Sequence, residues 1–145
     1  MTILSPMIEY NYEFEFEIED EPYFSDWISR IIDREDHRVG DISYVFCDDS
    51  YLLDLNKRYL DHDTYTDIIT FDYTEGLIIS GDIFISVERI RDNAKEYGVE
   101  FNEELIRVMA HGILHLLGYK DKSEVDSRLM RKKEEEMIEL FHVEH

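Results

Sequence analysis

Cysteine is nearly absent from this chain, which has Cys47 as its only thiol among 145 residues. One cysteine cannot form an internal disulfide, and a reducing compartment suits such a protein. Long apolar runs are also missing, because no stretch approaches the roughly eighteen residues of a membrane span. The first residues lack a basic segment followed by a long apolar stretch, which is the pattern of a secretory signal. We therefore expect a cytoplasmic protein with no membrane partner.

Basic residues are scarce as well. Fifteen lysines and arginines face 35 acidic residues, which gives a net charge of −20. Proteins that bind nucleic acids usually do so with basic surface, whereas an acidic body suits a basic protein partner. The basic residues are unevenly placed, since three lie in residues 1–50 and the other twelve lie beyond position 56. This distribution allows a local basic patch on an acidic body.

Hydrophobic periodicity predicts the order of the secondary-structure elements. Alternating apolar residues predict strands at 10–18, 41–47, 67–73 and 77–86. Helical spacing predicts helices at about 22–37, over 50–56, and at 87–97, 102–117 and 123–141, with a polar loop at 60–66. Composition and length fit one globular domain over residues 1–145. The order indicates an α+β fold with a mixed four-stranded sheet packed with about five helices.

Several local features accompany this prediction. Asp49 or Ser50 is expected to cap the second helix, Asn102 the fourth, and Ser123 the last. Gly81 inside a strand favours a bulge or a close backbone approach, with a ligand groove along an edge strand as one interpretation. The charged run at residues 131–136 is interpreted as a solvated helix face.

The run from His111 to Asp121 carries the strongest chemical signal. Two histidines four residues apart on a helix share one face, which places both imidazoles within reach of one metal ion. Gly118 is typical of a helix end with a left-handed residue, and the reversal can return Asp121 to that face. Three protein ligands leave a coordination position open, as in catalytic zinc sites. The alternative is a pair of polar residues at the edge of a core.

Position 112 bears on the kind of chemistry. Zinc proteases with this ligand spacing carry glutamate directly after the first histidine, where it acts as the general base. This chain has Gly112 there, which cannot move a proton. A metal ion itself can lower the pKa of bound water to about 7, so hydrolysis does not require that glutamate. A metalloprotease or other zinc amidohydrolase is therefore the second choice.

Three segments together resemble the YbeY family of bacterial metal-dependent endoribonucleases. The run from His111 to Asp121 is similar to the metal motif of that family. Residues 55–71, with Asn56 and Thr66-Asp67-Ile-Ile-Thr70-Phe71, are similar to its Asn…Thr-Asp-x-x-Ser/Thr-Phe block. Gly81-Asp82-Ile83 is similar to its Gly-Asp-Ile strand. The three segments occur in the order of the family and span about residues 55–121.

The sequence departs from the family at two positions. The family most commonly has histidine as the third ligand, where this chain has Asp121, a sound ligand for zinc and for harder divalent ions. A rival alignment slides the Asp-His pair of the family by one residue and leaves no third ligand. At Leu60 many relatives carry an arginine, whose role is either vacant here or taken by Lys57 or Arg58, our candidates for a catalytic side chain.

The resemblance implies a single-strand-specific endoribonuclease that acts in ribosomal RNA maturation, including 3′-end processing of small-subunit rRNA, and in ribosome quality control. It implies one metal ion per chain, zinc or another divalent metal, held by His111, His115 and Asp121. The expected partners are single-stranded or ribosomal RNA and a basic ribosomal protein. A non-catalytic ribosome assembly factor is a third interpretation. The residues expected to bind substrate, unless they are ordinary surface residues, are Asn56, Lys57, Arg58, Lys120 and Lys122.

Overall fold

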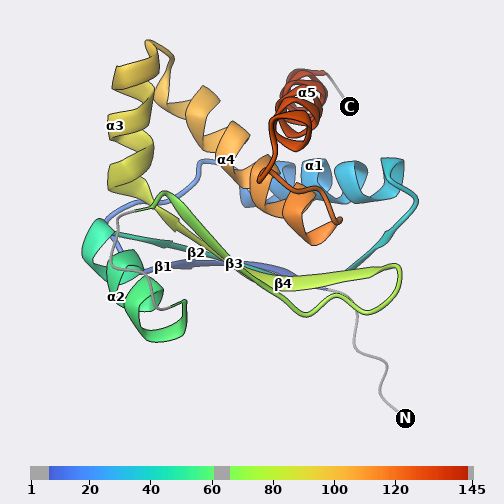
Figure 1. Ribbon diagram of the computed structural model, residues 1–145, viewed down its shortest axis with the longest axis horizontal. Coiled ribbons are helices and arrows are strands. Elements are labelled where there is room, and N and C mark those ends of the chain that lie inside the picture. Colours follow the sequence, from blue (N-terminus) through green and yellow to red (C-terminus); the bar gives the residue numbers. More distant parts are fainter. Residues whose placement is uncertain (1–6, 61–65, 144–145) are drawn as a thin grey trace.

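The computed structural model describes residues 7–60 and 66–143. Nine helices and strands lie within these two ranges (Figure 1). The polar loop expected at 60–66 falls mostly outside them. None of the helices in the described ranges is both long and apolar enough to cross a membrane.

The sheet has four strands in the order β1-β2-β4-β3. β1 pairs with β2, and β2 pairs with β4, in parallel, whereas β3 is antiparallel to β4. The mixed sheet predicted from the sequence is thus confirmed. The strands are β1 (Ile8–Tyr12), β2 (Arg38–Cys47), β3 (Ile68–Asp72) and β4 (Ile78–Ser86).

Helices cover the two faces of the sheet unequally. Figure 1 shows α1, α3, α4 and α5 above the sheet and α2 below it. The upper core joins strand residues such as Ile83 and Ile85 to the four helices, whereas Leu52 of α2 packs with Ile69 on the opposite face. Alternate residues of β3 and β4 therefore serve two separate cores. The helices are α1 (Glu21–Arg34), α2 (Asp49–Tyr59), α3 (Val87–Tyr97), α4 (Phe101–Leu116) and α5 (Glu124–His142).

The predicted strand over residues 10–18 is wrong beyond Tyr12. The Glu13 N–H still donates to the carbonyl of Phe46 at 2.7 Å, but β2 ends one residue later and offers no further partner. Phe14 and Phe16 nevertheless pack against the upper core. The alternation of these phenylalanines with glutamates therefore reflects burial of one side of the segment, and not continued hydrogen bonding between strands.

Two predicted caps are also wrong. Asp48, and not Asp49 or Ser50, caps α2, because its carboxylate accepts from the Tyr51 N–H at 2.8 Å. Helix α4 begins after Glu100 without a side-chain cap, so Asn102 lies inside the helix. Ser123 caps α5 as predicted, with its hydroxyl accepting from the Asp126 N–H.

Gly81 allows a close approach, as one of its two interpretations predicted. A Cβ at this position would lie 2.5 Å from the carbonyl of Phe71 and 2.9 Å from Leu116 of α4. The edge-strand interpretation is wrong, because β4 lies between β2 and β3. The glycine instead lets the end of α4 settle onto the middle of the sheet.

Candidate metal centre

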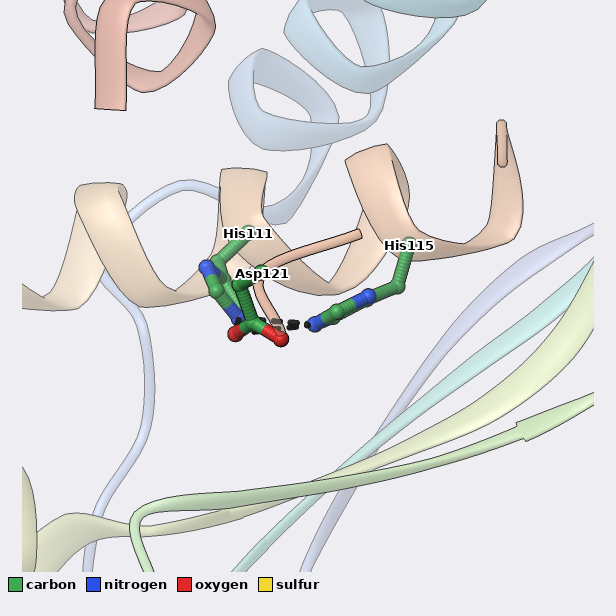
Figure 2. A group of neighbouring side chains, drawn as sticks. All are labelled: His111, His115 and Asp121. Atoms are coloured by element: carbon green, nitrogen blue, oxygen red, sulfur yellow. Dashed lines mark hydrogen bonds and ion pairs between the residues drawn. The ribbon is translucent and has the colours of Figure 1, made fainter. Parts of the chain in front are cut away.

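Helix α4 presents two histidines from one face. His111 and His115 are one turn apart, and their Nε2 atoms lie 2.9 Å from each other. Figure 2 shows both rings projecting from the same side of the helix, toward the sheet. The arrangement follows from the 3.6-residue period, which stacks residues four apart. Ten buried residues on the rest of α4 hold the helix in the core and so fix the direction of the two rings.

The turn after α4 returns the chain to this face. Gly118 has a φ of +103°, a left-handed conformation that side chains disfavour. Its N–H donates to the carbonyl of His115, and the Tyr119 N–H donates to that of Leu114, both at 3.0 Å. This pair of bonds is the Schellman motif, which ends a helix and reverses the chain. The reversal places Asp121 over the two histidines (Figure 2).

The three side chains are spaced as metal ligands. Asp121 Oδ2 lies 3.3 Å from His111 Nε2 and 3.6 Å from His115 Nε2. Ligand atoms about 2.0–2.2 Å from a tetrahedral zinc ion lie roughly 3.3–3.5 Å from one another. The described residues contain one group of three or more such side chains close enough to hold a metal, and it is this one. Two imidazoles and a carboxylate fit zinc or a harder divalent ion.

The outer nitrogens of both rings are already engaged. His115 Nδ1 lies 3.1 Å from the carbonyl of Tyr119, and His111 Nδ1 lies 2.6 Å from Oε2 of Glu134. Carbonyls and carboxylates only accept, so in each neutral ring the proton belongs on Nδ1. Burial lowers the pKa of His115, with the neighbouring His111 adding to the effect, which favours the neutral ring. Two Nε2 lone pairs then face each other beside a carboxylate, and a cation satisfies all three.

A second set of contacts fixes the turn. The Tyr119 hydroxyl donates to Glu35, which follows α1. Lys133 of α5 lies 3.3 Å from the other oxygen of Glu35 and 5.7 Å from the centre of the Tyr119 ring. The Ser127 hydroxyl donates to the Asp121 carbonyl at 3.0 Å. The position of Asp121 therefore depends on α1 and α5 as well as on α4.

Gly112 faces the sheet. A Cβ at this position would lie 2.9 Å from Ile83 of β4 and 3.1 Å from Ile68 of β3. A glutamate would have to displace these side chains to be accommodated. The position that supplies the general base in zinc proteases is thus used here for close packing of helix on sheet.

The other residues predicted for the site are distributed over two layers. Lys120 and Lys122 are exposed on either side of Asp121. Lys57 and Arg58 are exposed near the end of α2, which packs on the opposite face of the sheet from α4, and Arg58 pairs with Asp54 at 3.0 Å. Asn56 is buried on the same helix, and Leu60 is its exposed C-terminal cap. The α2 set therefore lies in a different layer from the helix that carries His111 and His115.

Sequence reasoning missed a buried charge network beside His111. The interpretation of residues 131–136 as a solvated face is wrong for Glu134, which is 3% exposed. Arg107 contacts both Glu134 and Glu104, a second buried carboxylate. The burial of Glu134 could have been predicted from the sequence, because residues 130, 134 and 137 share one face of a helix and Met130 and Met137 are buried.

Asp67 is a further acidic group near the site. Burial raises the pKa of its carboxyl, against the opposing effects of His111 and Arg107. Asn93 donates to Oδ2 at 3.3 Å, and the Ser86 N–H donates to the Asp67 carbonyl at 3.0 Å. The Thr66 hydroxyl contacts the carbonyl of Ile68 at 3.4 Å. These bonds fasten the start of β3 to β4 and α3.

In this α+β domain, α4 supplies two histidines and the turn after it supplies a carboxylate. This is the donor set of a metal-dependent hydrolase. The family model described as endoribonuclease YbeY matches residues 9–142. The chain belongs to this family.

Curated relatives and a solved structure agree with this assignment. The chain is 60% identical to the endoribonuclease YbeY of Flavobacterium johnsoniae, over 95% of this chain and 99% of the relative. It is 56% identical to that of Flavobacterium psychrophilum, over 94% and 98% of the two chains. The solution structure of a Thermotoga maritima protein matches with a TM-score of 0.64 at 25% identity, over 93% of this chain and 89% of the other.

Proposed function

We propose that this protein is a metal-dependent endoribonuclease that cleaves single-stranded ribosomal RNA in the cytoplasm. It would act in 3′-end maturation of small-subunit rRNA and in ribosome quality control. The observation that carries the proposal is the convergence of His111, His115 and Asp121 in a chain of the endoribonuclease YbeY family. One zinc ion per chain, or another divalent ion, would be held by these three side chains.

The exposure of the donors indicates the side from which RNA approaches. The side chains of His111 and His115 are 17% and 27% exposed, whereas that of Asp121 is 44% exposed. Substrate therefore reaches the site over the turn that carries Asp121. Lys120 and Lys122 lie on that turn, and their ammonium groups would contact phosphates.

The site chemistry then divides between the ion and the chain. A bound divalent ion supplies Lewis acidity toward a phosphate oxygen and lowers the pKa of water. Glu134 and the Tyr119 carbonyl hold the two imidazoles in the tautomer that offers Nε2 to the ion. Lys57 and Arg58 remain our candidates for a catalytic contact, and Asn56 for a substrate contact.

The alternatives have less support. Gly112 packs on the sheet, so the chain lacks the general base of zinc proteases at the position where they carry it. A purely structural assembly factor does not need three convergent metal donors. A basic ribosomal protein remains a proposed partner, because the acidic body of the protein complements it.

The decisive experiment combines metal content with RNA cleavage. We expect the purified protein, prepared without a histidine tag, to hold one metal ion and to cleave single-stranded RNA but not casein. His111→Ala and His115→Ala should each abolish both properties, Asp121→Ala should weaken metal binding, and Asp121→His should retain it. Chelator-sensitive cleavage of casein without cleavage of RNA would overturn the proposal. Unchanged metal affinity in Asp121→Ala would remove Asp121 from the ligand set.

A further inference from the structure

One face of α4 carries four polar side chains in a continuous row. Glu104, Arg107, His111 and His115 are spaced by three, four and four residues, so they follow one stripe along the helix. The last two are the proposed metal ligands. The first two lie nearer the start of the helix, where Glu104 is only 2% exposed and Arg107 is 33% exposed. The metal site is thus the outer end of a row that begins in the core.

Helix α5 completes this row with Glu134. Its Oε1 lies 3.1 Å from Arg107 Nη1, and its Oε2 lies 2.6 Å from His111 Nδ1. Arg107 also contacts Glu104 through two nitrogens, with Nε at 3.0 Å from Oε1. Both oxygens of each carboxylate therefore have a donor.

This network does more than satisfy buried groups. A ring can bind a metal through Nε2 only if its proton is on Nδ1 and its plane is fixed. Glu134 meets both conditions for His111, because it accepts from Nδ1 and is itself fixed by Arg107. The other ligand, His115, donates the equivalent bond from Nδ1 to the backbone carbonyl of Tyr119, which no side-chain substitution removes. The orientation of His111 therefore depends on one side chain, that of Glu134, whereas the orientation of His115 does not.

We propose that Glu134, held in place by Arg107, is a positioning residue that sets metal affinity by fixing the orientation and tautomer of His111. This inference rests on the proposed metal site. It assigns to α5 a role that the three-ligand description leaves out, and it links metal binding to the packing of α5 on α4.

Glutamine at position 134 tests the proposal with little change in shape. The amide has one accepting oxygen and one donating nitrogen, whereas Arg107 and His111 both present donors to Glu134. In Glu134→Gln, therefore, either one of the two contacts is lost or the amide N–H donates to His111 Nδ1, which moves the ring proton to Nε2. Glu104→Gln is a matched control, because it also removes one buried charge and one acceptor facing Arg107, but Glu104 has no described bond to His111.

The measurement is the affinity for Zn²⁺ and Co²⁺ alone, by chelator competition and by the visible absorption of tetrahedral Co²⁺. We expect Glu134→Gln to bind about 10- to 100-fold more weakly than the parent, as for other partners of metal-bound histidines. Glu104→Gln should stay within about threefold of the parent, although both variants lose similar stability toward urea. Equal losses of affinity in the two variants, or none in Glu134→Gln, would overturn the proposal.

Two further observations keep the test decisive. The ¹⁵N shifts of the His111 ring in metal-free protein should report one tautomer in the parent and a mixture in Glu134→Gln. If Glu134→Gln does not fold, Glu134→Asp replaces it, since its shorter side chain keeps the charge but cannot span both partners. A parent protein that binds no metal refutes the proposed function, whereas a parent that binds metal equally well without Glu134 refutes only this inference.

Discussion

At the residue scale, Gly112 shows how one small residue affects both packing and chemistry. It lies between the two histidine positions, where α4 packs directly on Ile83 of β4 and Ile68 of β3. The methyl group of an alanine would meet Ile83, which is fully buried and branched at Cβ, so its Cγ2 cannot swing away. The same contact excludes the glutamate that a zinc protease uses.

We expect Gly112→Ala to lower the free energy of unfolding by about 1 kcal/mol. The cost of overpacking, about 1–3 kcal/mol, outweighs the gain of about 1 kcal/mol in helix propensity. Urea unfolding of the parent and the variant measures the difference. In an Ile83→Ala background the penalty should disappear, and a penalty that persists there would show that the crowding has another source.

The three metal donors could be predicted from the sequence because they lie within eleven residues. Helix periodicity and the Gly118 turn, both local properties, bring them together. Glu134 was not predicted as part of the site, since its place beside His111 depends on how α5 packs on α4. The relation of Lys57 and Arg58 to the site likewise depends on tertiary structure, which no local pattern defines.

At the element scale, the start of α2 is tied to the start of α3 by one carboxylate. Asp49 Oδ1 accepts from the Ser86 hydroxyl at 2.6 Å, and Oδ2 lies 2.9 Å from Arg89 Nη2. Ser86 is the N-cap of α3. Burial alone would raise the pKa of the Asp49 carboxyl, but the bonds to Arg89 and Ser86 outweigh it and lower the pKa below 3.8.

This lowered pKa predicts a pH-dependent contribution to stability. Ionised Asp49 stabilises the folded state fully above about pH 4, and the contribution is lost as the pH falls through the lower folded-state pKa. We expect Asp49→Asn to cost about 1 kcal/mol at pH 7, a modest value because the pair is partly exposed, and little near pH 2.

Denaturant unfolding at several pH values tests this prediction. Asp92→Asn is the control, because Asp92 contacts the same arginine but is 56% exposed. It should have little effect at any pH. A cost of Asp49→Asn that did not change with pH would contradict the assigned cause.

The elements themselves were largely predictable, whereas their ends were less so. Helix α3 has the predicted bounds, and β4 begins one residue later than predicted. β1 ends before Phe14 and Phe16 because its neighbour β2 ends at Cys47. The end of β1 therefore depends on its pairing partner and not on the identity of these two residues. Periodicity reports which side of a segment is buried, but the hydrogen-bonding partner decides where a strand stops.

At the scale of the whole molecule, a net charge of −20 must coexist with RNA as substrate. Repulsion between this charge and RNA extends about 8–10 Å at physiological salt. Lys120 and Lys122 are exposed on the turn, whereas Arg107 and Lys133 nearby are paired with glutamates. A small contact area followed by cleavage fits this charge distribution better than a broad electrostatic interface.

We therefore expect RNA affinity to depend only weakly on salt. Each phosphate contacted on a single strand contributes about −0.7 to the slope of log affinity against log salt, and we expect about two to four contacts. Binding of a short single-stranded RNA at several salt concentrations measures the slope.

Charge reversal at Lys57 and Arg58 should reduce the slope by about one to two contacts and leave metal content unchanged. A slope equivalent to about eight phosphates or more would contradict this account.

The placement of the site along the chain also bears on the order of folding. His111 and His115 are four residues apart, and His111 and Glu134 are 23 apart. Contacts across β2 and β4 join residues such as Cys47 and Ile85, which are 38 apart. Closing shorter loops costs less entropy, and local contacts form sooner. A full-length chain that refolds would thus bring its donors together while the parallel sheet is still incomplete, so metal uptake becomes a step in refolding and not an addition to a finished protein.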